Sequence, residues 1–290
     1  MSSAGRRFPR VTAVIPTFNW STVLGCSIAS ALDQTFDDFE LLVVGDCCTD
    51  DTAELVATFT ARDRRVRWIN LPEHGGSQVG PNNEGIRQAA GELIAYLGHD
   101  DLWLPRHLEL LVAAMTSSPD GPGMAHGRAV LVNPGRQPFV FPHSSWRYRH
   151  GEWIPPTSTM HRASALHAVG GWRSHDSTGT LDPETDLCGR LSEQFGPPLL
   201  VAHVTSVKLP AVYRRNVYRD RPNAEQTAWL ARIRAADDPE AELEGLCGEP
   251  DAPGPGGDDP VALLEPVMRP SVSAAERYRV LREFKGLDPP

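Results

Sequence analysis

This sequence of 290 residues has few cysteines and no cysteine pattern typical of a metal or redox centre. The five cysteines are an odd number, none of them forms a Cys-x-x-Cys pair, and Cys47 and Cys48 are direct neighbours. Zinc sites and dithiol redox motifs need closely spaced cysteines, and disulfide frameworks belong to oxidising compartments. The pattern therefore predicts free thiols in a reducing compartment, and we expect a cytoplasmic protein.

Long apolar runs and excess positive charge are also missing. No stretch approaches the ~18 apolar residues that a membrane-spanning helix needs, and residues 1–10 contain no apolar segment resembling a signal peptide. The formal net charge is -9, whereas nucleic-acid surfaces need a basic patch. We expect no transmembrane segment and no nucleic-acid partner.

Glycine-rich nucleotide motifs are absent as well. A dehydrogenase would carry Gly-x-Gly-x-x-Gly after its first strand, but Pro16 to Trp20 contain no glycine and the next one is Gly25. A sugar nucleotidyltransferase would be expected to have a glycine-rich, arginine-bearing loop at the same place. No Gly-x-x-x-x-Gly-Lys-Ser/Thr occurs anywhere. These absences exclude dehydrogenases, nucleotidyltransferases and Walker-type phosphotransferases.

The first half does contain short apolar segments that alternate with amphipathic ones. The apolar segments predict strands at 11–16, 40–45, 66–71 and 92–97, and the amphipathic segments predict helices at 22–34, 52–62, 83–90 and 105–117. Such alternation is typical of an α/β fold with a mostly parallel central sheet and helices on both faces.

The second half is less regular. We expect a hairpin at 124–132 with 138–141, a Trp- and Pro-rich loop at 142–156, and helices at 163–169 and 184–194. An acidic Pro/Gly-rich linker would follow at 237–260 and a terminal helix at 271–284.

Polar or glycine-rich segments follow all four predicted strands, at 16–19, 46–51, 74–83 and 98–101. Ligands of open α/β sheets bind at the carboxyl ends of the strands. We therefore expect these four segments to meet at one crevice.

The adjacent acids Asp100 and Asp101 carry the strongest chemical signal. Two neighbouring carboxylates favour a divalent cation, and oxygen ligands suit Mg²⁺ or Mn²⁺. A cation there can stabilise a departing diphosphate. The alternative is that the acids cap a helix N-terminus. Asp46 also has two interpretations. It accepts a hydrogen bond from the ring N–H of a nucleotide base, or it caps the next helix.

Several ordered motifs resemble family 2 glycosyltransferases. They are Val-Ile-Pro-Thr-Phe-Asn at 14–19, Gln-Thr-Phe at 34–36, Glu-Leu-Leu-Val-Val-Gly-Asp at 40–46, Thr-Asp-Asp-Thr at 49–52, and Gly-Glu-Leu-Ile-Ala-Tyr-Leu at 91–97 with the closing Asp-Asp. The resemblance covers roughly 11–200 and implies a single A-type nucleotide-sugar domain that acts with inversion. It implies a catalytic domain over 8–220, with a nucleotide-binding half at 11–101 and an acceptor half at 102–220. A small C-terminal helical extension would follow over 221–290.

The resemblance also assigns roles. It places Asp46 at the base, Asp100 at the ribose or donor sugar, and Asp101 on the metal, Mn²⁺ or Mg²⁺. It assigns the rest of the nucleotide-sugar pocket to Pro16, Thr17, Asn19, Asn82 and Asn83. Many relatives carry an acid where this chain has Gly98, but the last two acids are the essential ones. We expect His99 to be an exposed loop histidine.

The resemblance further identifies the general base and one acceptor residue. Pro-Glu-Thr-Asp-Leu-Cys-Gly-Arg-Leu at 183–191 resembles the helix that carries the family's catalytic carboxylate. Glu184 takes the position of the base and Asp186 is the second candidate, although acids at a helix start are also favourable without any catalytic role. Trp172, in a Gly-Gly-aromatic turn, would stack on the acceptor or pack in the core.

Together these observations predict an inverting, metal-assisted transfer from a nucleotide-diphosphate sugar to an acceptor hydroxyl. The acceptor would be a saccharide, a lipid-linked compound or a small molecule. The alternative is a catalytically degenerate relative that only binds a nucleotide or glycan.

Overall fold

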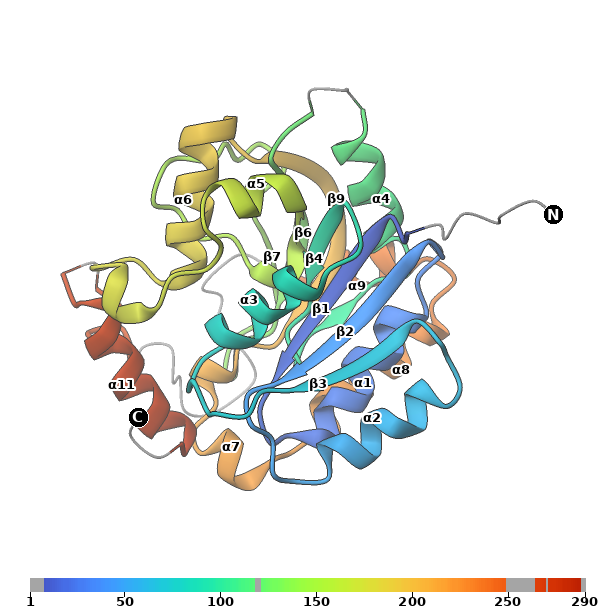
Figure 1. The fold of residues 1–290 in the computed structure, drawn as a ribbon, viewed down its shortest axis with the longest axis horizontal. Coiled ribbons are helices and arrows are strands. Elements are labelled where there is room, and N and C mark those ends of the chain that lie inside the picture. Colours follow the sequence, from blue (N-terminus) through green and yellow to red (C-terminus); the bar gives the residue numbers. More distant parts are fainter. Residues whose placement is uncertain (1–7, 118–120, 249–263, 270, 288–290) are drawn as a thin grey trace.

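The computed structural model describes residues 8–117, 121–248, 264–269 and 271–287. Its centre is a nine-stranded sheet with the order β3-β2-β1-β4-β8-β6-β9-β5, and β7 pairs with β6 (Figure 1). The strands are β1 (Val11–Thr17), β2 (Phe39–Gly45), β3 (Val66–Asn70), β4 (Leu93–Tyr96), β5 (Leu102–Trp103), β6 (Met124–Leu131), β7 (Phe139–Phe141), β8 (Thr159–Arg162) and β9 (Leu199–Lys208).

Helices surround this sheet. They are α1 (Ser21–Leu32), α2 (Thr52–Thr60), α3 (Val79–Gln88), α4 (His107–Met115), α5 (Ala163–Ala168), α6 (Pro183–Phe195), α7 (Val217–Asp220), α8 (Ala224–Ala235), α9 (Pro239–Leu246) and α11 (Ala274–Lys285). Three short 3₁₀ turns lie at η1 (Pro156–Ser158), η2 (His175–Ser177) and η3 (Ala211–Tyr213).

The half of the sheet formed by β1 to β4 is parallel, as predicted. β1 pairs in parallel with both β2 and β4, and β2 pairs in parallel with β3. All seven residues of β1 and of β2 are buried, which explains their nearly continuous apolar sequence, because strands covered on both faces have no solvent side.

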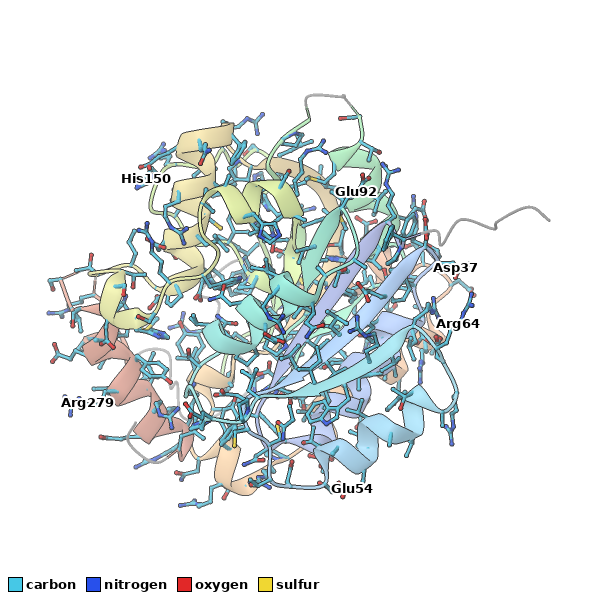
Figure 2. The ribbon with its side chains drawn as sticks, in the orientation of Figure 1. Asp37, Glu54, Arg64, Glu92, His150 and Arg279 are labelled. Carbon is cyan, nitrogen blue, oxygen red and sulfur yellow. The ribbon has the colours of Figure 1, made fainter. Side chains whose placement is uncertain are left out.

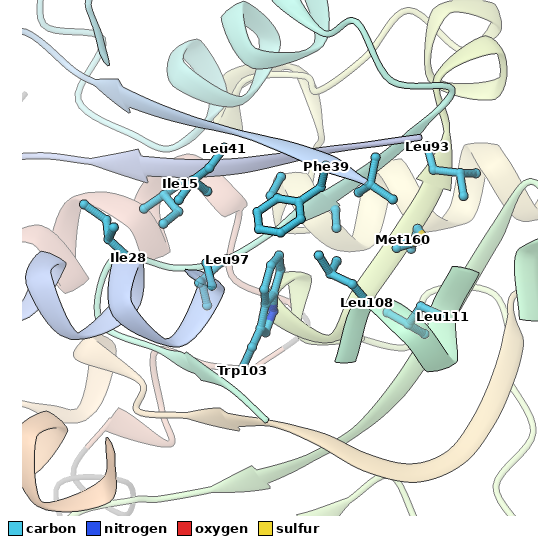
Figure 3. Close-up of a cluster of buried hydrophobic side chains, with 14 of the residues drawn as sticks. Ile15, Ile28, Phe39, Leu41, Leu93, Leu97, Trp103, Leu108, Leu111 and Met160 are labelled. Atoms are coloured by element: carbon cyan, nitrogen blue, oxygen red, sulfur yellow. The ribbon is translucent and has the colours of Figure 1, made fainter. Parts of the chain in front are cut away.

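Helices cover both faces, as expected from the alternation of strands and helices. On one face, α1, α2 and α4 pack through Ile28, Val56 and Leu108 against Ile15 and other strand residues; Figure 3 shows this cluster around Phe39 and Trp103. On the other face, α3, α5 and α6 pack through Ile86, Leu166 and Leu187. The α/β class is therefore confirmed.

The second half of the sheet is mixed. β8 is antiparallel to β4 and β6, β5 is antiparallel to β9, and the predicted hairpin forms as the antiparallel pair β6–β7. β9 runs parallel to β6. The strands β5, β8 and β9 were not predicted from the sequence.

The region after residue 220 also forms more structure than expected. α8 and α9 place Leu230, Ile233 and Leu243 in a third apolar cluster with residues of β5, β6 and β9. α9 occupies the first part of the predicted linker at 237–260, and the part from 249 onward lies outside the described residues. The predicted domain boundary at residue 220 stays a prediction.

The terminal helix forms close to its predicted place. α11 begins after Ser273, whose hydroxyl accepts a hydrogen bond from the N–H of Glu276, and it ends at Gly286 with a φ of 81°. Ser and Glu at this spacing form a capping box, and a left-handed glycine is a common helix end. α11 lies on the left of Figure 1, near α7 and the loop before α6.

Charged side chains lie around the outside of the molecule. Figure 2 labels Asp37 and Arg64 at the edge where β2 and β3 begin, and Arg279 on the outer side of α11. No helix within the described residues has the length and apolar character needed to cross a membrane.

Candidate active site

The carboxyl ends of β1, β2 and β4 lie side by side because these strands are parallel and adjacent. They carry Thr17, Asp46 and the loop from Gly98 to Asp101 respectively. Three of the four predicted polar segments therefore meet at one edge of the sheet, and residues 74–76 join them through Asp46. The four predicted polar segments therefore come together at this edge, and the crevice itself stays a prediction.

Asp46 is almost fully buried, with 3% of its surface exposed. Its Oδ1 accepts a hydrogen bond from the N–H of Gly75 and its Oδ2 from the N–H of Gly76, both at 2.8 Å, and His74 Nδ1 lies 2.9 Å from Oδ2. The carboxylate thus orders the loop after β3. Within the described residues Oδ1 accepts only the bond from Gly75 and has a second lone pair, so Asp46 keeps acceptor capacity for a ligand.

Asn19 joins the loops that follow β1 and β2. Its Oδ1 accepts hydrogen bonds from the N–H of Thr49 at 2.7 Å and of Asp50 at 3.2 Å, and its backbone φ is 43°. Asparagine tolerates this left-handed conformation better than most residues. Pro16 is buried within β1. Asn19 therefore holds the loop after β2 against the loop after β1, and direct contact with a nucleotide stays a prediction for both residues.

The two adjacent asparagines of α3 have different surroundings. Asn83 donates through Nδ2 to the carbonyl of Trp172 at 3.0 Å, and its Oδ1 accepts from the N–H of Trp172 at 2.9 Å. Asn82 is fully buried, and among the described residues neither amide atom of its side chain has a hydrogen-bond partner. Asn83 fixes the Trp172 loop, whereas the amide of Asn82 is available to a further polar group.

Asp101 is engaged by the protein itself. It is 1% exposed, its Oδ2 accepts a hydrogen bond from Lys208 Nζ at 2.9 Å, and its Oδ1 accepts from the N–H of Leu209 at 2.9 Å. Burial raises the pKa of Asp101, while Lys208 acts against that rise. Burial alone would lower the pKa of Lys208, but Asp101 and Asp100 raise it. The 2.9 Å contact and the N–H of Leu209 favour an ionised pair.

Asp100 differs from its neighbour. It is 6% exposed and has no hydrogen-bond or ion-pair partner within the part of the chain that the structure describes. Both acids surround Gly98, where an added Cβ would collide with Asp101 Oδ2 and lie 3.2 Å from Asp100 Oδ1. This explains why glycine stands where many relatives have an acid, because a side chain at position 98 would displace Asp101.

The acidic side chains at this edge of the sheet fit the predicted divalent cation in part. Among the described residues no group of three or more His, Cys, Asp and Glu side chains is placed to hold a metal. Mg²⁺ in nucleotide sites is held by one or two carboxylates together with phosphate oxygens and water. Asp100 fits that pattern as the available carboxylate, and Asp101 fits it less well because the ammonium of Lys208 already balances its charge.

His99 is not the exposed loop histidine that the sequence suggested. It is 6% exposed, its Nδ1 lies 3.0 Å from Thr17 Oγ1, and its Nε2 lies 3.0 Å from the hydroxyl of Tyr218. Burial lowers the pKa of His99 to about 4, so the imidazole is neutral at neutral pH. The expectation was wrong because Tyr218, 119 residues later in the chain, covers the loop.

Glu184 lies in the first turn of α6, directly after Pro183 at the first helical position. Its Oε1 lies 3.3 Å from Trp153 Nε1 and its Oε2 lies 3.4 Å from Gln78 Nε2, and both nitrogens are donors. Burial, followed by the nearby Asp182, raises the pKa of Glu184. A carboxylate with a raised pKa is well suited to accept a proton.

Asp186 has a structural partner instead. Its Oδ2 accepts a hydrogen bond from Arg190 Nε at 2.8 Å, and Arg190 also donates to the carbonyls of Val169 and Gly171. This ion pair fixes α6 against the loop before Trp172. The two candidate bases are thus distinguished, since Glu184 has only long hydrogen bonds and Asp186 is paired.

Trp172 packs in the core. It is 4% exposed, and its ring meets Tyr96 edge-to-face with 5.2 Å between ring centroids. With the ring in this position, Trp172 offers no face to an acceptor. The core alternative for this residue therefore describes the structure better than the stacking role.

Two lysines near this site, Lys208 and Lys285, were not predicted from the sequence. Lys208 at the end of β9 and Lys285 at the end of α11 both interact electrostatically with Asp100 and Glu184. Burial lowers the pKa of Lys285 to about 8. No motif marks either lysine. Only the pairing of β9 with β6 and the return of the C-terminal helix bring them here.

Solved structures with the same fold were found by comparison. The chain aligns with TarS 1–349 of S. aureus in complex with UDP-GlcNAc at a TM-score of 0.57 and 17% identity, covering 81% of this chain and 69% of that one. It aligns with the mannosyltransferase PcManGT of Pyrobaculum calidifontis, in complex with GDP-Man and Mn²⁺, at a TM-score of 0.55 and 16% identity, covering 97% and 88%. The fold is that of an A-type glycosyltransferase.

Sequence comparison is more specific. Residues 12–163, just over half of the chain, match Glycosyl transferase family 2, and the chain belongs to this family. It is 32% identical over 105 residues to the UDP-Glc:alpha-D-GlcNAc-diphosphoundecaprenol beta-1,3-glucosyltransferase WfgD of Escherichia coli. That match covers 36% of this chain and 40% of the relative, so less than half of the relative's length is matched.

Proposed function

We propose that this protein is an inverting glycosyltransferase that moves a sugar from a nucleoside-diphosphate donor to an acceptor hydroxyl. One observation supports this above the others. Glu184 on α6 and Asp100 after β4 both act electrostatically on the ammonium of Lys208. This supports the proposal that the candidate base and the acidic pair share one site, as a single displacement requires.

In the proposed reaction Glu184 removes the proton from the acceptor hydroxyl. The acceptor oxygen forms a bond to the anomeric carbon while the bond from that carbon to the diphosphate breaks, and the electron pair leaves with the diphosphate. Because attack and departure occur on opposite faces, the anomeric configuration inverts. Trp153 and Gln78 keep the Glu184 carboxylate in place through its two oxygens.

We further propose a divalent cation, Mn²⁺ or Mg²⁺, bound by Asp100. When bound, the cation would hold diphosphate oxygens and stabilise the charge of the leaving group. Asp101 would position the loop through Lys208 and Leu209 rather than contact the cation with both oxygens. PcManGT was solved with Mn²⁺ and GDP-Man, which supports testing Mn²⁺ first.

The nucleotide pocket and the acceptor follow from the same reasoning. We propose that Asp46 accepts a hydrogen bond from the base and that Thr17 and Asn82 border the nucleotide. The name of the Escherichia coli relative gives a diphosphoundecaprenol-linked acceptor, so a lipid-linked saccharide is the first acceptor class to test. All five cysteines are free, in keeping with the cytoplasmic location that we propose.

The test is turnover of a panel of UDP- and GDP-sugars, with nucleoside diphosphate release and the anomeric configuration of the product measured by NMR. We expect one donor to be consumed with inversion, and Glu184→Gln to retain donor binding while losing at least about 100-fold in rate, as loss of a general base does. Retention of configuration, or normal turnover by Glu184→Gln, would contradict the proposal.

A further inference from the structure

Helix α11 is attached to the loop that Asp46 orders. Arg282 Nη1 donates a hydrogen bond to the carbonyl of Gly76 at 2.6 Å, and the hydroxyl of Tyr278 donates to the same carbonyl. The N–H of Gly76 is bound to Asp46. Gly76 therefore links α11 to Asp46, the residue that we propose to contact the nucleotide base.

The first half of α11 is attached to the region of the general base. Arg277 donates through Nη2 to the carbonyl of Thr180 at 2.7 Å and through Nε to Asp182 Oδ1 at 3.1 Å. Asp182 lies directly before α6 and two residues before Glu184. The N–H of Ala274 adds a bond to the carbonyl of Gly179 at 2.8 Å. α11 thus bridges the nucleotide side and the base side of the site.

Lys285, the last residue of α11, lies beyond both attachments and interacts electrostatically with Asp100 and Glu184. Its Nζ lies 5.5 Å from the centroid of the Tyr218 ring, and Tyr218 in turn contacts His99 of the Asp100 loop. Within the described residues Lys285 makes no hydrogen bond and no ion pair, although it is only half exposed to solvent. The cations Arg282 and Lys208 act on it together with Asp100 and Glu184.

An ammonium group in this position lacks the anion that burial normally requires. Charged groups removed from water are costly unless they are paired, and here two further cations increase the cost. A ligand with two or more negative charges would supply the missing anion to Lys285 and offset the repulsion from the other two cations. The ligand that the proposed function brings to this edge of the sheet is a nucleoside diphosphate.

We propose that Lys285 binds the diphosphate of the donor and that α11 thereby forms one wall of the donor site. This inference rests on the proposed function and deepens it, because it names a donor-binding residue outside the matched family segment at 12–163. Lysine contacts phosphate as a point charge through up to three N–H donors.

The test compares Lys285→Met with Arg279→Met. Arg279 lies on the same helix, is exposed, and points outward in Figure 2, so it loses the same charge without touching the site. Both variants are titrated with UDP, GDP, dTDP and CDP and with the matching nucleoside monophosphates. For the diphosphate that binds the wild type, we expect Lys285→Met to lose about tenfold in affinity or more, as removal of a charged hydrogen bond does. We expect Arg279→Met to be unchanged.

Two further readouts separate binding from a structural role. Lys285→Met should lose much less affinity for the monophosphate than for the diphosphate, and its Tm should stay equal or rise because an unpaired cation has been removed. Lys285→Arg keeps the charge and should bind close to wild type. If Lys285→Met fails to fold, or binds the diphosphate like wild type, the inference is overturned. Absence of diphosphate binding by the wild type would instead contradict the proposed function.

Discussion

Lys208 Nζ donates a hydrogen bond to Asp101 Oδ2 at 2.9 Å, across 107 residues of sequence. The contact joins the end of β9 to the loop after β4, so it ties the mixed part of the sheet to its parallel part. It also uses one of the two acids that the sequence offers for metal binding. Asp101 therefore has a structural role, whereas Asp100 is available to a ligand.

Loss of Lys208 should destabilise the protein. Removing one partner of a buried ion pair costs about 3–5 kcal/mol because the remaining charge has no partner, and Asp101 is only 1% exposed. We expect Lys208→Met to lower the free energy of unfolding by about that much in urea titrations. The double variant Lys208→Met/Asp101→Asn should recover part of the loss. A double variant as unstable as the sum of the single variants would contradict the pairing.

A side chain at Gly98 should disturb Asp101. A Cβ at this position would collide with Asp101 Oδ2 and lie 3.0 Å from Asp101 Cγ, and Lys208 and Leu209 hold that carboxylate in place. We expect Gly98→Ala to cost about 1–3 kcal/mol, in the range of other overpacked sites. Thermal and urea unfolding measure this cost. Gly151→Ala is a control for the steric clash, because an added Cβ at this exposed position would meet nothing within 4 Å. It does not control for backbone conformation, because the φ of Gly151 is 85°.

The pH dependence of transfer should depend on Trp153. Glu184 must be ionised to act as a base, so the rate rises with pH through the pKa of Glu184, which burial places above the usual value. The hydrogen bond from Trp153 lowers that pKa, so Trp153→Phe should move the acid limb of kcat to higher pH. Tyr148→Phe, in the same loop, should leave the limb in place. A shift of the Trp153→Phe limb to lower pH would contradict the assignment of the base.

Stability should fall in mild acid because four histidines are buried. Burial lowers the pKa to about 4 for His99 and His126 and to about 3 for His107 and His161. The unfolded chain takes up protons near pH 6.5 whereas the folded chain does not, so stability is lost as pH falls from about 6.5 towards 4. Each histidine contributes up to about 1.4 kcal/mol per pH unit.

Urea unfolding at pH 7.5 and at 5.5 measures this loss. His161→Phe should reduce the difference between the two pH values, because one buried imidazole no longer takes up a proton on unfolding. An equal or larger difference in the variant would contradict the assignment of His161 as a neutral buried group.

The parallel half of the fold could be predicted from sequence because its strands are buried on both faces. Segments such as Glu40 to Gly45 are continuous apolar runs bounded by polar loops, and the structure forms β2 there. β9 was missed because only its residues from Val204 to Val207 are buried, and two of these four, Thr205 and Ser206, are polar. α8 falls within the predicted helical extension over 221–290, but its bounds were not predicted because its apolar side chains are only partly regular in spacing.

The acids of the site were identifiable, but their separate roles were not. Asp100 and Asp101 are equivalent in sequence, and only Lys208 and Leu209, more than 100 residues later, distinguish them. Glu184 and Asp186 are likewise distinguished by Arg190, which binds one and not the other. Lys285 carries no motif at all. Contacts between distant segments decide each of these cases.

The central claim is a nucleotide-sugar site at the carboxyl ends of β1, β2 and β4. The most direct test is calorimetric titration of the full chain with UDP, GDP, dTDP and CDP, each with and without Mn²⁺, repeated for Asp100→Asn. We predict that one nucleotide binds the wild type, that Mn²⁺ strengthens its binding, and that Asp100→Asn loses the metal effect. Absence of binding by all four nucleotides, with and without Mn²⁺, would contradict the account.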